Sequence, residues 1–280
     1  MKILLLNAFD TGGGAAQAAV RLVEALNQYH VNATLGVIDK KSLCPYVIEV
    51  PKKKTKSKFR FLKKLLSLVS KIFCKLFPFI KSKFITSNNI LHSTNFKSVI
   101  DVNWINNSDY DLVNLHWINA DMISIKDIGK ITKPIVWTMH DSWPCCGAEH
   151  HPNILENDTR YITGYTKQNK PETTKGKDIC KKVWEKKLKY LTNANIVFVA
   201  PSTWENNVLK SSYLFKKNKS WTIPNIIDHN IFNKKDKNQI RKIFDLPENK
   251  KIIGFGAAYD IDNPNSMKGS YHLVNALSKL

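Results

Sequence analysis

The chain has 280 residues, 43% of them hydrophobic, and a formal net charge of +20. That much apolar surface can form a core, which excludes a wholly disordered chain, and no apolar run is long enough for a membrane-spanning helix. So large a positive charge predicts an anionic partner or surface. The five cysteines are odd in number and scattered (Cys44, Cys74, Cys145, Cys146 and Cys180), which favours a reducing compartment, and we therefore expect a cytoplasmic protein.

Short apolar runs alternate with stretches of helical periodicity along the chain. In order, the pattern predicts a strand at 2–7, a helix at 15–29, a strand at 33–39, a helix at 95–106, a strand at 112–117, a helix at 123–130, a strand at 134–139, a helix at 177–193, a strand at 196–200, a helix from 202, a strand at 220–223, a strand at 252–255 and a helix from 268. This alternation predicts the α/β class, with a parallel sheet covered by helices on both faces.

A domain boundary is expected where polar and turn residues, IPNIIDHNIFNKKDKNQIRKIFDLPENKK, separate two of these strands. We place a first domain at 1–224, with a basic insertion at 52–83, a linker at 225–249 and the start of a second α/β domain at 250–280. One strand and one helix cannot bury the face of a sheet on their own. We therefore expect the chain to be a fragment that stops inside its second domain.

Three consecutive glycines lie between the first strand and the first helix, in NAFDTGGGAAQAA. Gly12, Gly13 and Gly14 would let the backbone approach a ligand closely, while the helix N-terminus presents free N–H groups to a phosphate. A strand-to-helix turn with small residues for tight packing is the other interpretation. A dinucleotide site is disfavoured, because Gln17 stands where the third glycine of that fingerprint belongs, although Asp39 ends the second strand as a ribose-binding carboxylate does.

His140 and Asp141 directly follow the strand at 134–139, in IVWTMHDSWP. Open α/β sheets bind ligands beyond the carboxyl ends of their strands, so both side chains are candidate catalytic residues. The imidazole suits proton transfer or a hydrogen bond to a sugar hydroxyl, and the carboxylate could fix its tautomer or bind the ligand itself. Alternatively, Asp141 or Ser142 only begins a turn and His140 is structural.

Several side chains after this motif have the chemistry of zinc ligands: Cys145, Cys146, His150, His151 and Cys180. No two cysteines have the Cys-x-x-Cys spacing of structural zinc sites, so we expect no metal site. The sequence also lacks the Gly-x-Ser-x-Gly, Walker A and His-Glu-x-x-His motifs, which disfavours the hydrolase classes that use them.

The segment from 52 to 83 holds twelve lysines and arginines and no acidic residue, so more than half of the net charge of +20 lies there. Within it, KFRFLKKLLSLVSKIFCKLF predicts a helix with a broad apolar face and a basic opposite face. Such a helix enters the headgroup boundary of anionic lipid. We favour membrane binding, with Lys63, Lys64, Lys71 and Lys75 as contact residues, over a helix packed on its own domain with a solvated lysine face.

Six stretches, in their order and spacing, point to one family. They are NAFDTGGGAAQAAVRL, DLVNLHWIN, IKDIGKITKPIVWTMHDSWP, VAPSTWENNVLKSS, IPNIIDHNIF and MKGSYHLVNAL. Together they resemble bacterial glycosyltransferases of family 4 with the GT-B fold, of the kind that builds cell-surface polysaccharides. The resemblance implies two Rossmann-like domains that face a cleft, the first binding mainly the acceptor and the second mainly a nucleotide-sugar donor.

The resemblance also implies roles for individual residues. The loop from Gly12 to Gly14 would border the cleft near the donor phosphates or the acceptor, and His140 would meet the transferred sugar. Lys268, which with Gly269 opens the last predicted helix, matches a family lysine that neutralises the donor diphosphate. We then expect a retaining transferase without metal or other cofactor, in which Lys268 and helix N-termini offset the charge of the leaving diphosphate.

The chain departs from the family pattern at three points. Relatives close in sequence often carry several cysteines after the His-Asp-x-Trp-Pro stretch, whereas residues 145–150, CCGAEH, keep few of them. Gly256 is followed by Ala257 where an arginine often stands, and the family's pair of donor-binding glutamates would lie beyond Leu280. We therefore expect no sugar transfer by these 280 residues alone. An inactive or regulatory relative that holds sugar or lipid is the main alternative. A nucleic-acid-binding role is supported by charge alone, so nucleic acid is not an expected partner.

We predict that residues 52–83 dock the protein peripherally on the anionic inner face of the plasma membrane, where a glycan or lipid-linked acceptor would be presented. Each lysine near anionic lipid contributes about 1 kcal/mol, and salt weakens that attraction. The intact chain should co-sediment with anionic vesicles more than with neutral ones, and a variant with Lys63, Lys64, Lys71 and Lys75 changed to Glu should not. Equal sedimentation of both proteins with anionic vesicles would contradict membrane docking.

Overall fold

The structure is a computed structural model that describes residues 1–53, 90–152, 158–172, 174–256 and 268–279. The chain divides into two compact units, Met1–Ile227 and Asp228–Leu280. No helix within the described ranges combines the length and the apolar character needed to cross a membrane. The basic segment predicted at 52–83 lies outside the described residues from residue 54 onward, and so does the whole of the helix predicted within it.

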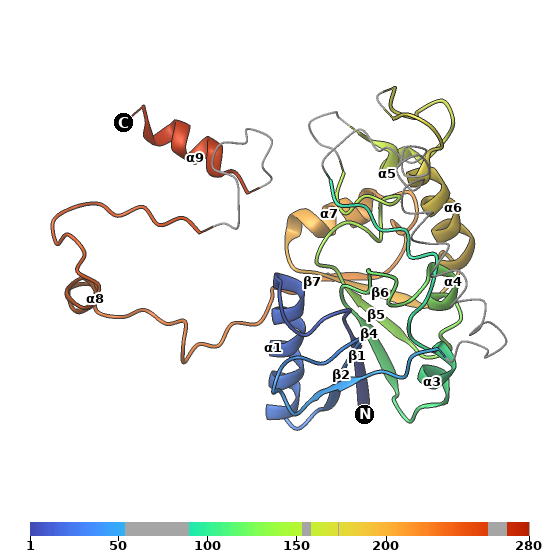
Figure 1. Ribbon diagram of the computed structural model, residues 1–280, viewed down its shortest axis with the longest axis horizontal. Helices are drawn as coiled ribbons and strands as arrows, with labels where there is room; N and C mark the ends of the chain where they lie inside the picture. The colour runs from blue at the N-terminus through green and yellow to red at the C-terminus, as the bar shows by residue number, and fades with distance from the viewer. Residues whose placement is uncertain (54–89, 153–157, 173, 257–267, 280) are drawn as a thin grey trace, which may run out of the picture. The chain divides into compact units, whose positions relative to one another are not determined.

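The described part of the first unit contains one sheet, whose strands are β1 (Lys2–Leu6), β2 (Asn32–Val37), β3 (Val47–Glu49), β4 (Leu112–Leu115), β5 (Ile135–Thr138), β6 (Ile196–Ala200) and β7 (Ser220–Thr222). They lie in the order β3-β2-β1-β4-β5-β6-β7, and every neighbouring pair is parallel. The helices described in this unit are α1 (Gly14–Gln28), α3 (Val102–Asn107), α4 (Ile125–Ile128), α5 (Arg160–Thr163), α6 (Ile179–Leu191) and α7 (Thr203–Ser211). The predicted α/β class with a Rossmann-like parallel sheet is confirmed (Figure 1).

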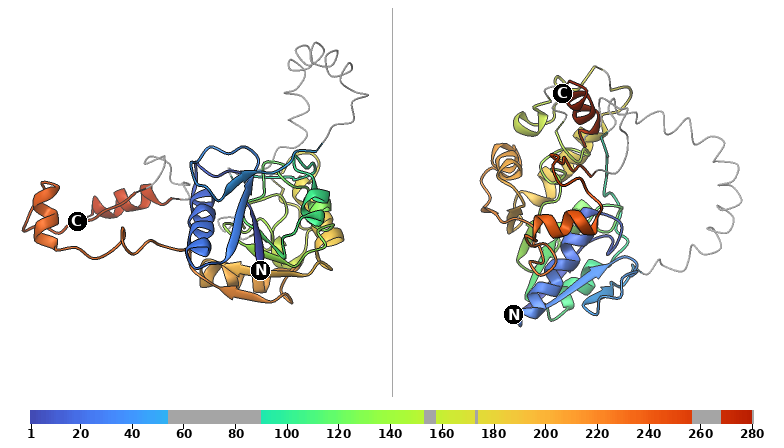
Figure 2. Two further views of the ribbon diagram at one scale, coloured as in Figure 1. Left: turned by 90° about the horizontal axis from the view of Figure 1, so that it is seen from below. Right: turned by 90° about the vertical axis from the view of Figure 1, so that its left-hand side faces the viewer.

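Alternate side chains of the interior strand β1 enter two hydrophobic clusters, one on each face of the sheet. Leu4 and Leu6 belong to the larger cluster, to which α3, α4, α6 and α7 also contribute. Ile3 and Leu5 belong to the smaller cluster, with residues of α1 and β2. Figure 2 shows α1 and α3 on opposite sides of the sheet. Full burial of each such side chain stabilises the fold by about 1.5 to 3 kcal/mol.

Strands β5 and β6 are well covered on one face only. Trp137 and Phe198 are buried in the larger cluster, whereas Val136 and Val199, which alternate with them, are half-buried. The half-buried side chains line a hollow beside α1. Within the described residues, the expected helical cover on both faces is therefore present at β1 and β2 and incomplete at β5 and β6.

The helix predicted at 95–106 is wrong in its first half. α3 begins only after Asp101, whose carboxylate caps its N-terminus. Before it, Asn95 takes a positive φ of 41°, and its side-chain amide donates to the carbonyls of Ile118 and Ile123. These bonds to buried loop carbonyls hold the backbone outside a helix, and apolar periodicity gives no sign of them.

The second unit contains α8 (Lys237–Ile243) and α9 (Ser270–Leu277) among its described residues. The sequence pattern does not predict α8, which lies within the expected linker at 225–249. The strand predicted at 252–255 is wrong, because these residues pair with no other strand and their apolar side chains are exposed. A strand needs a neighbour for its backbone hydrogen bonds, and the described residues of this unit provide none.

Candidate functional site

The carboxyl ends of three neighbouring parallel strands bring polar side chains to one edge of the sheet. Asn7 follows β1, His116 follows β4 and His140 lies just beyond β5. The Asn7 side chain joins two of these ends, because its oxygen accepts a hydrogen bond from the Trp117 N–H at 2.8 Å. This edge is where open α/β sheets bind their ligands.

His116 and His140 contact each other directly at this edge. His116 Nδ1 lies 2.9 Å from His140 Nε2, and the two rings stack with centroids 5.1 Å apart. His116 Nε2 lies 3.0 Å from the side-chain oxygen of Asn114. The amide nitrogen of Asn114 donates to the Val136 carbonyl and to the Thr138 hydroxyl, both at 3.0 Å, so the Asn114 oxygen faces His116.

These contacts fix the tautomers of both rings. An amide oxygen only accepts, so His116 carries its proton on Nε2 and accepts at Nδ1. His140 must then donate from its Nε2, which leaves Nδ1 of His140 with a lone pair. No described residue donates to that nitrogen, so it can accept a hydrogen bond from a ligand.

Both histidines are neutral at physiological pH. Burial lowers the pKa of His116 well below its ordinary value, and the neighbouring His140 lowers it further. Burial also lowers the pKa of His140, against an opposing effect of the Asp141 carboxylate. Neutral His140 keeps the lone pair on Nδ1 that a ligand hydroxyl needs.

The Asp141 carboxylate is fully engaged in hydrogen bonds. One oxygen accepts from Trp117 Nε1 at 3.0 Å and from His150 Nδ1 at 2.6 Å, and the other accepts from the Trp143 N–H at 3.0 Å. His150 Nε2 in turn lies 2.7 Å from Ser93 Oγ. Asp141 therefore orders the turn after β5 and connects it with the segment around Ser93.

The buried side chain of Lys187, in α6, binds backbone carbonyls of the same turn. Lys187 Nζ donates to the backbone carbonyls of Trp143, Cys146 at 3.1 Å and Gly147 at 2.7 Å, and it lies 3.6 Å from the centroid of the Trp143 ring. Its side chain is completely buried, and burial lowers its pKa to about 7. Lys187 supplies the hydrogen bonds that these carbonyls of an irregular turn cannot obtain from water.

Glu205 of α7 lies behind the turn. One of its carboxylate oxygens accepts from Ser142 Oγ at 3.2 Å, whereas the other is buried and has no hydrogen-bond partner in the described part of the chain. Burial raises the pKa of Glu205 to about 7, and the charge of Asp141 adds to that effect. The carboxyl group is therefore close to half-ionised at neutral pH.

The glycine loop is open to its surroundings. Gly12 has a φ of +80°, which glycine adopts without strain, and a methyl group built on Gly12, Gly13 or Gly14 would meet no atom within 4 Å. Tight packing, one of the two interpretations of these glycines, is therefore not observed among the described residues. No side chain caps the N-terminus of α1 at Gly13, so its first N–H groups can meet a ligand.

A pocket of about 370 Å³ lies against this end of α1. It is lined by Gly13, Gly14, Gln17, Ala18, Arg21, Asn225 and Ile226. A more apolar hollow of about 320 Å³, with His116 in its wall, shares Ala18, Asn225 and Ile226 with the pocket. The glycine loop and His116 therefore border adjoining hollows of the first unit.

The remaining predicted site residues belong to the second unit or lie outside the described residues. Lys268 is an exposed residue of the second unit, directly before Gly269 and α9, and the geometry above is complete without it. The predicted membrane-binding residues lie outside the described residues: Lys63, Lys64, Lys71 and Lys75.

The side chains weighed as zinc ligands do not gather into one cluster. Cys146 is completely buried, and burial raises the pKa of its thiol. Both ring nitrogens of His150 are engaged in hydrogen bonds. Cys180 instead lies with His92 and Glu149, and one potential ligand atom of each lies within 4.8 Å of the other two.

The sequence predictions missed two residues on which the site depends. His116 directly follows the apolar run of DLVNLHWIN, and His140 lies just beyond the next strand, so two polar residues at neighbouring strand ends were the available signal. Lys187 lies four residues after Val183 and four before Leu191, both buried, and this spacing places it on the buried stripe of α6. No protein-family model and no curated protein matches the chain, so the candidate site rests on its geometry.

We predict that Lys187→Met lowers the free energy of unfolding by about 3 kcal/mol or more, because three buried carbonyl groups lose their donor. Lys189→Met changes an exposed lysine of the same helix and should alter it by less than about 0.5 kcal/mol. Urea unfolding followed by circular dichroism measures both. Equal effects of the two variants would show that Lys187 does not stabilise the turn.

We predict that Glu205 makes stability depend on pH. Between pH 4.5 and about 7 the native state keeps a proton on Glu205 that the unfolded state releases, so the contribution of Glu205 to the free energy of unfolding falls as the pH rises through this window and is constant above it. The fall amounts to about 3 kcal/mol. His116, His140 and Lys187, whose pKa values are lowered, add slopes of the opposite sign, so the test compares each variant with the wild type. In urea unfolding between pH 5 and pH 8, the stability of the wild type relative to Glu205→Gln should fall as the pH rises, and its stability relative to the exposed control Glu185→Gln should stay constant. A constant difference between wild type and Glu205→Gln would contradict the prediction.

Proposed function

We propose that the protein is a nucleotide-sugar-dependent glycosyltransferase with the GT-B architecture, which acts on a glycan or lipid-linked acceptor in surface polysaccharide synthesis. The observation that carries this proposal is the contact between His116 and His140, which presents an imidazole nitrogen with a lone pair at the carboxyl edge of the sheet. A sugar hydroxyl donates to such a nitrogen, and a neutral ring adds no charge to the site.

The reaction needs a positioned sugar and a stabilised leaving group. The acceptor hydroxyl oxygen forms a bond with the anomeric carbon, and the bond from that carbon to the diphosphate oxygen breaks. The nucleoside diphosphate leaves with the electron pair, and the acceptor hydroxyl releases its proton. We place His140 Nδ1 against a hydroxyl of the transferred sugar, where its hydrogen bond orients the ring for attack.

The glycine loop is the part of the first unit best suited to the charge that develops on the diphosphate. Gly13 and Gly14 lie at the positive end of the α1 dipole, and Arg21 lines the same pocket. Lys268 of the second unit is the further cation that the family resemblance supplies. Donors that are already in place stabilise a developing negative charge without reorganising, and the transfer then needs no metal ion at the diphosphate.

Membrane docking belongs to the same proposal. A lipid-linked acceptor lies in the membrane surface, and a basic amphipathic segment at 52–83 would hold the acceptor side of the enzyme against it. The protein is then peripheral on the inner face of the plasma membrane.

We predict that His140→Ala lowers the rate of sugar transfer about 10- to 100-fold, the effect of losing one or two hydrogen bonds in the transition state. The test uses the protein encoded by the whole reading frame that contains these residues. Labelled nucleotide-sugars are mixed with a glycolipid extract, and the label that reaches the lipid is counted. His229→Ala, which changes an exposed histidine of the second unit, is the matched control and should transfer at the unchanged rate.

Two results would contradict the proposal at different levels. An unchanged rate for His140→Ala, with the urea midpoint also unchanged, would return His140 to a structural role. A protein that binds a nucleotide-sugar and transfers none of it to any acceptor would be the inactive, sugar-binding relative instead.

A further inference from the structure

Three chemically different side chains meet in the first unit from segments that are far apart in the sequence. His92 precedes the long connection to α3, Glu149 lies in the turn after β5, and Cys180 lies in the first turn of α6. One potential metal-ligand atom of each lies within 4.8 Å of the other two. His92 and Glu149 are also joined by an antiparallel backbone bridge.

The hydrogen bond of His92 leaves one of its ring nitrogens available. Nδ1 lies 2.5 Å from the Ile90 carbonyl, which only accepts, so Nδ1 carries the proton. Nε2 is buried and has no hydrogen-bond partner among the residues that the structure describes. Proteins orient a histidine toward a metal in this way, with one nitrogen held by a carbonyl and the lone pair of the other directed at the ion.

Glu149 is a buried carboxylate without a cation beside it. Its side chain is 4% exposed, and no lysine or arginine of the described ranges lies within 4.0 Å of its oxygens. The Tyr165 hydroxyl donates to one of these oxygens at 3.4 Å, and the Cys180 thiol forms a hydrogen bond with the same carboxylate. The charge of Lys187 acts on Glu149 without a contact ion pair, and a divalent cation bound to the carboxylate would neutralise it directly.

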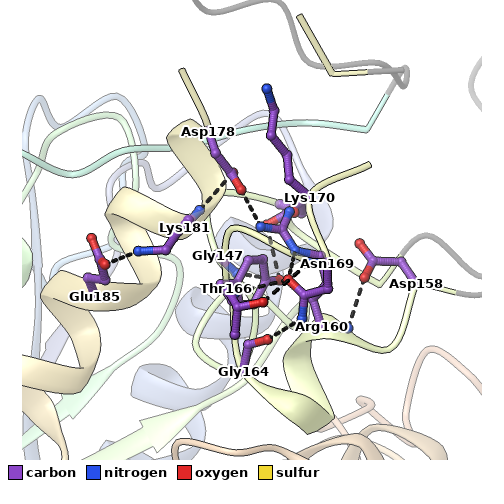
Figure 3. A network of polar contacts seen from close by, with 12 residues as sticks. Gly147, Asp158, Arg160, Gly164, Thr166, Asn169, Lys170, Asp178, Lys181 and Glu185 are labelled. Carbon is purple, nitrogen blue, oxygen red and sulfur yellow. Dashed lines mark hydrogen bonds and ion pairs between the residues drawn. The ribbon is translucent and has the colours of Figure 1, made fainter. Parts of the chain in front are cut away.

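A network of polar contacts fixes the beginning of α6, which carries Cys180. Arg160 forms a buried ion pair with Asp178, and the Asp178 carboxylate also caps α6 by accepting from the Lys181 N–H at 2.9 Å. The Asn169 side chain accepts from Arg160 Nε at 3.2 Å, as Figure 3 shows. A ligand on so well supported a helix end is held in place before any ion binds.

We propose that Cys180, Glu149 and His92 bind a zinc ion. Sulfur, imidazole nitrogen and carboxylate oxygen are the ligand types of zinc, and a thiolate disfavours magnesium and calcium. Ligand atoms around tetrahedral zinc lie roughly 3 to 4 Å apart. The three ligand atoms would therefore need to move by only about 1 Å, through side-chain rotation, to coordinate the ion. The fourth position remains for water or a further ligand.

The zinc ion would restrain the turn of the candidate site. His92 and Glu149 are the chain neighbours of Ser93 and His150, whose side chains lie 2.7 Å apart. His150 in turn donates to Asp141 at 2.6 Å. Zinc at this point joins the turn after β5, the segment around Ser93 and α6, and its role is structural. The proposal does not depend on the transferase activity.

Metal content and cobalt spectroscopy of the 280-residue chain test the proposal. The protein is stripped with a chelator, supplied with Zn²⁺ or Co²⁺ and separated from loose metal by gel filtration. We expect about one zinc ion per chain and, with Co²⁺, the charge-transfer absorption of a cobalt thiolate. Cys180→Ser should abolish that absorption, and His92→Gln should weaken zinc binding at least about 100-fold. Cys44→Ser, at a buried cysteine of the smaller cluster, should change neither.

The variants separate loss of the site from loss of the fold. His92 is partly exposed, so His92→Gln should keep the circular dichroism spectrum of the wild type, and it decides the outcome if Cys180→Ser does not fold. Cys74→Ser, at a position outside the described residues, should bind zinc normally. A chain that takes up no zinc, cobalt absorption that persists in Cys180→Ser, or zinc affinity unchanged in His92→Gln would overturn the proposal.

Discussion

The hydrogen bonds of the buried Lys187 side chain attach the irregular turn after β5 to helix α6. The turn after β5 has no sheet or helix of its own in which its carbonyls could be satisfied, and three of them bind Lys187 instead. Lys187 belongs to α6, whose apolar side chains are part of the larger hydrophobic cluster. Together with the hydrogen bonds of Asp141, Lys187 therefore ties the turn between His140 and Glu149 to the core.

The molecule as a whole is strongly basic, whereas the histidines of the candidate site carry no charge. The chain has a net charge of +20, yet burial keeps His116 and His140 neutral and leaves Glu205 only about half-ionised at neutral pH. Asp141 is stabilised by three donors. A site of this kind recognises hydroxyl groups by the direction of hydrogen bonds, and it leaves phosphate groups to the N-terminus of α1 and Arg21.

The sequence predicted the regular part of the first unit, because the buried runs of β1, β4, β5 and β6 differ clearly from amphipathic helices. β3 and α5, of three and four residues, are too short for any period to show. The helix predicted at 95–106 does not begin at Asn95, because the amide of this residue binds loop carbonyls. The position of His140 follows from a local rule about strand ends. The partnership of His140 with His116 follows from strand order, which no local pattern encodes.

β1 is an interior strand of the sheet, although it precedes both strands with which it pairs. Ile3 pairs with Ala33 on one side and with Leu112 on the other. At ribosomal rates of about 5 to 20 residues per second, one edge of this apolar strand waits several seconds longer for its partner than the other edge does. During synthesis the nascent chain thus exposes an unpaired strand edge that other chains can join. Protein yield in cells should then depend on the chaperones that cover such edges until β4 has emerged.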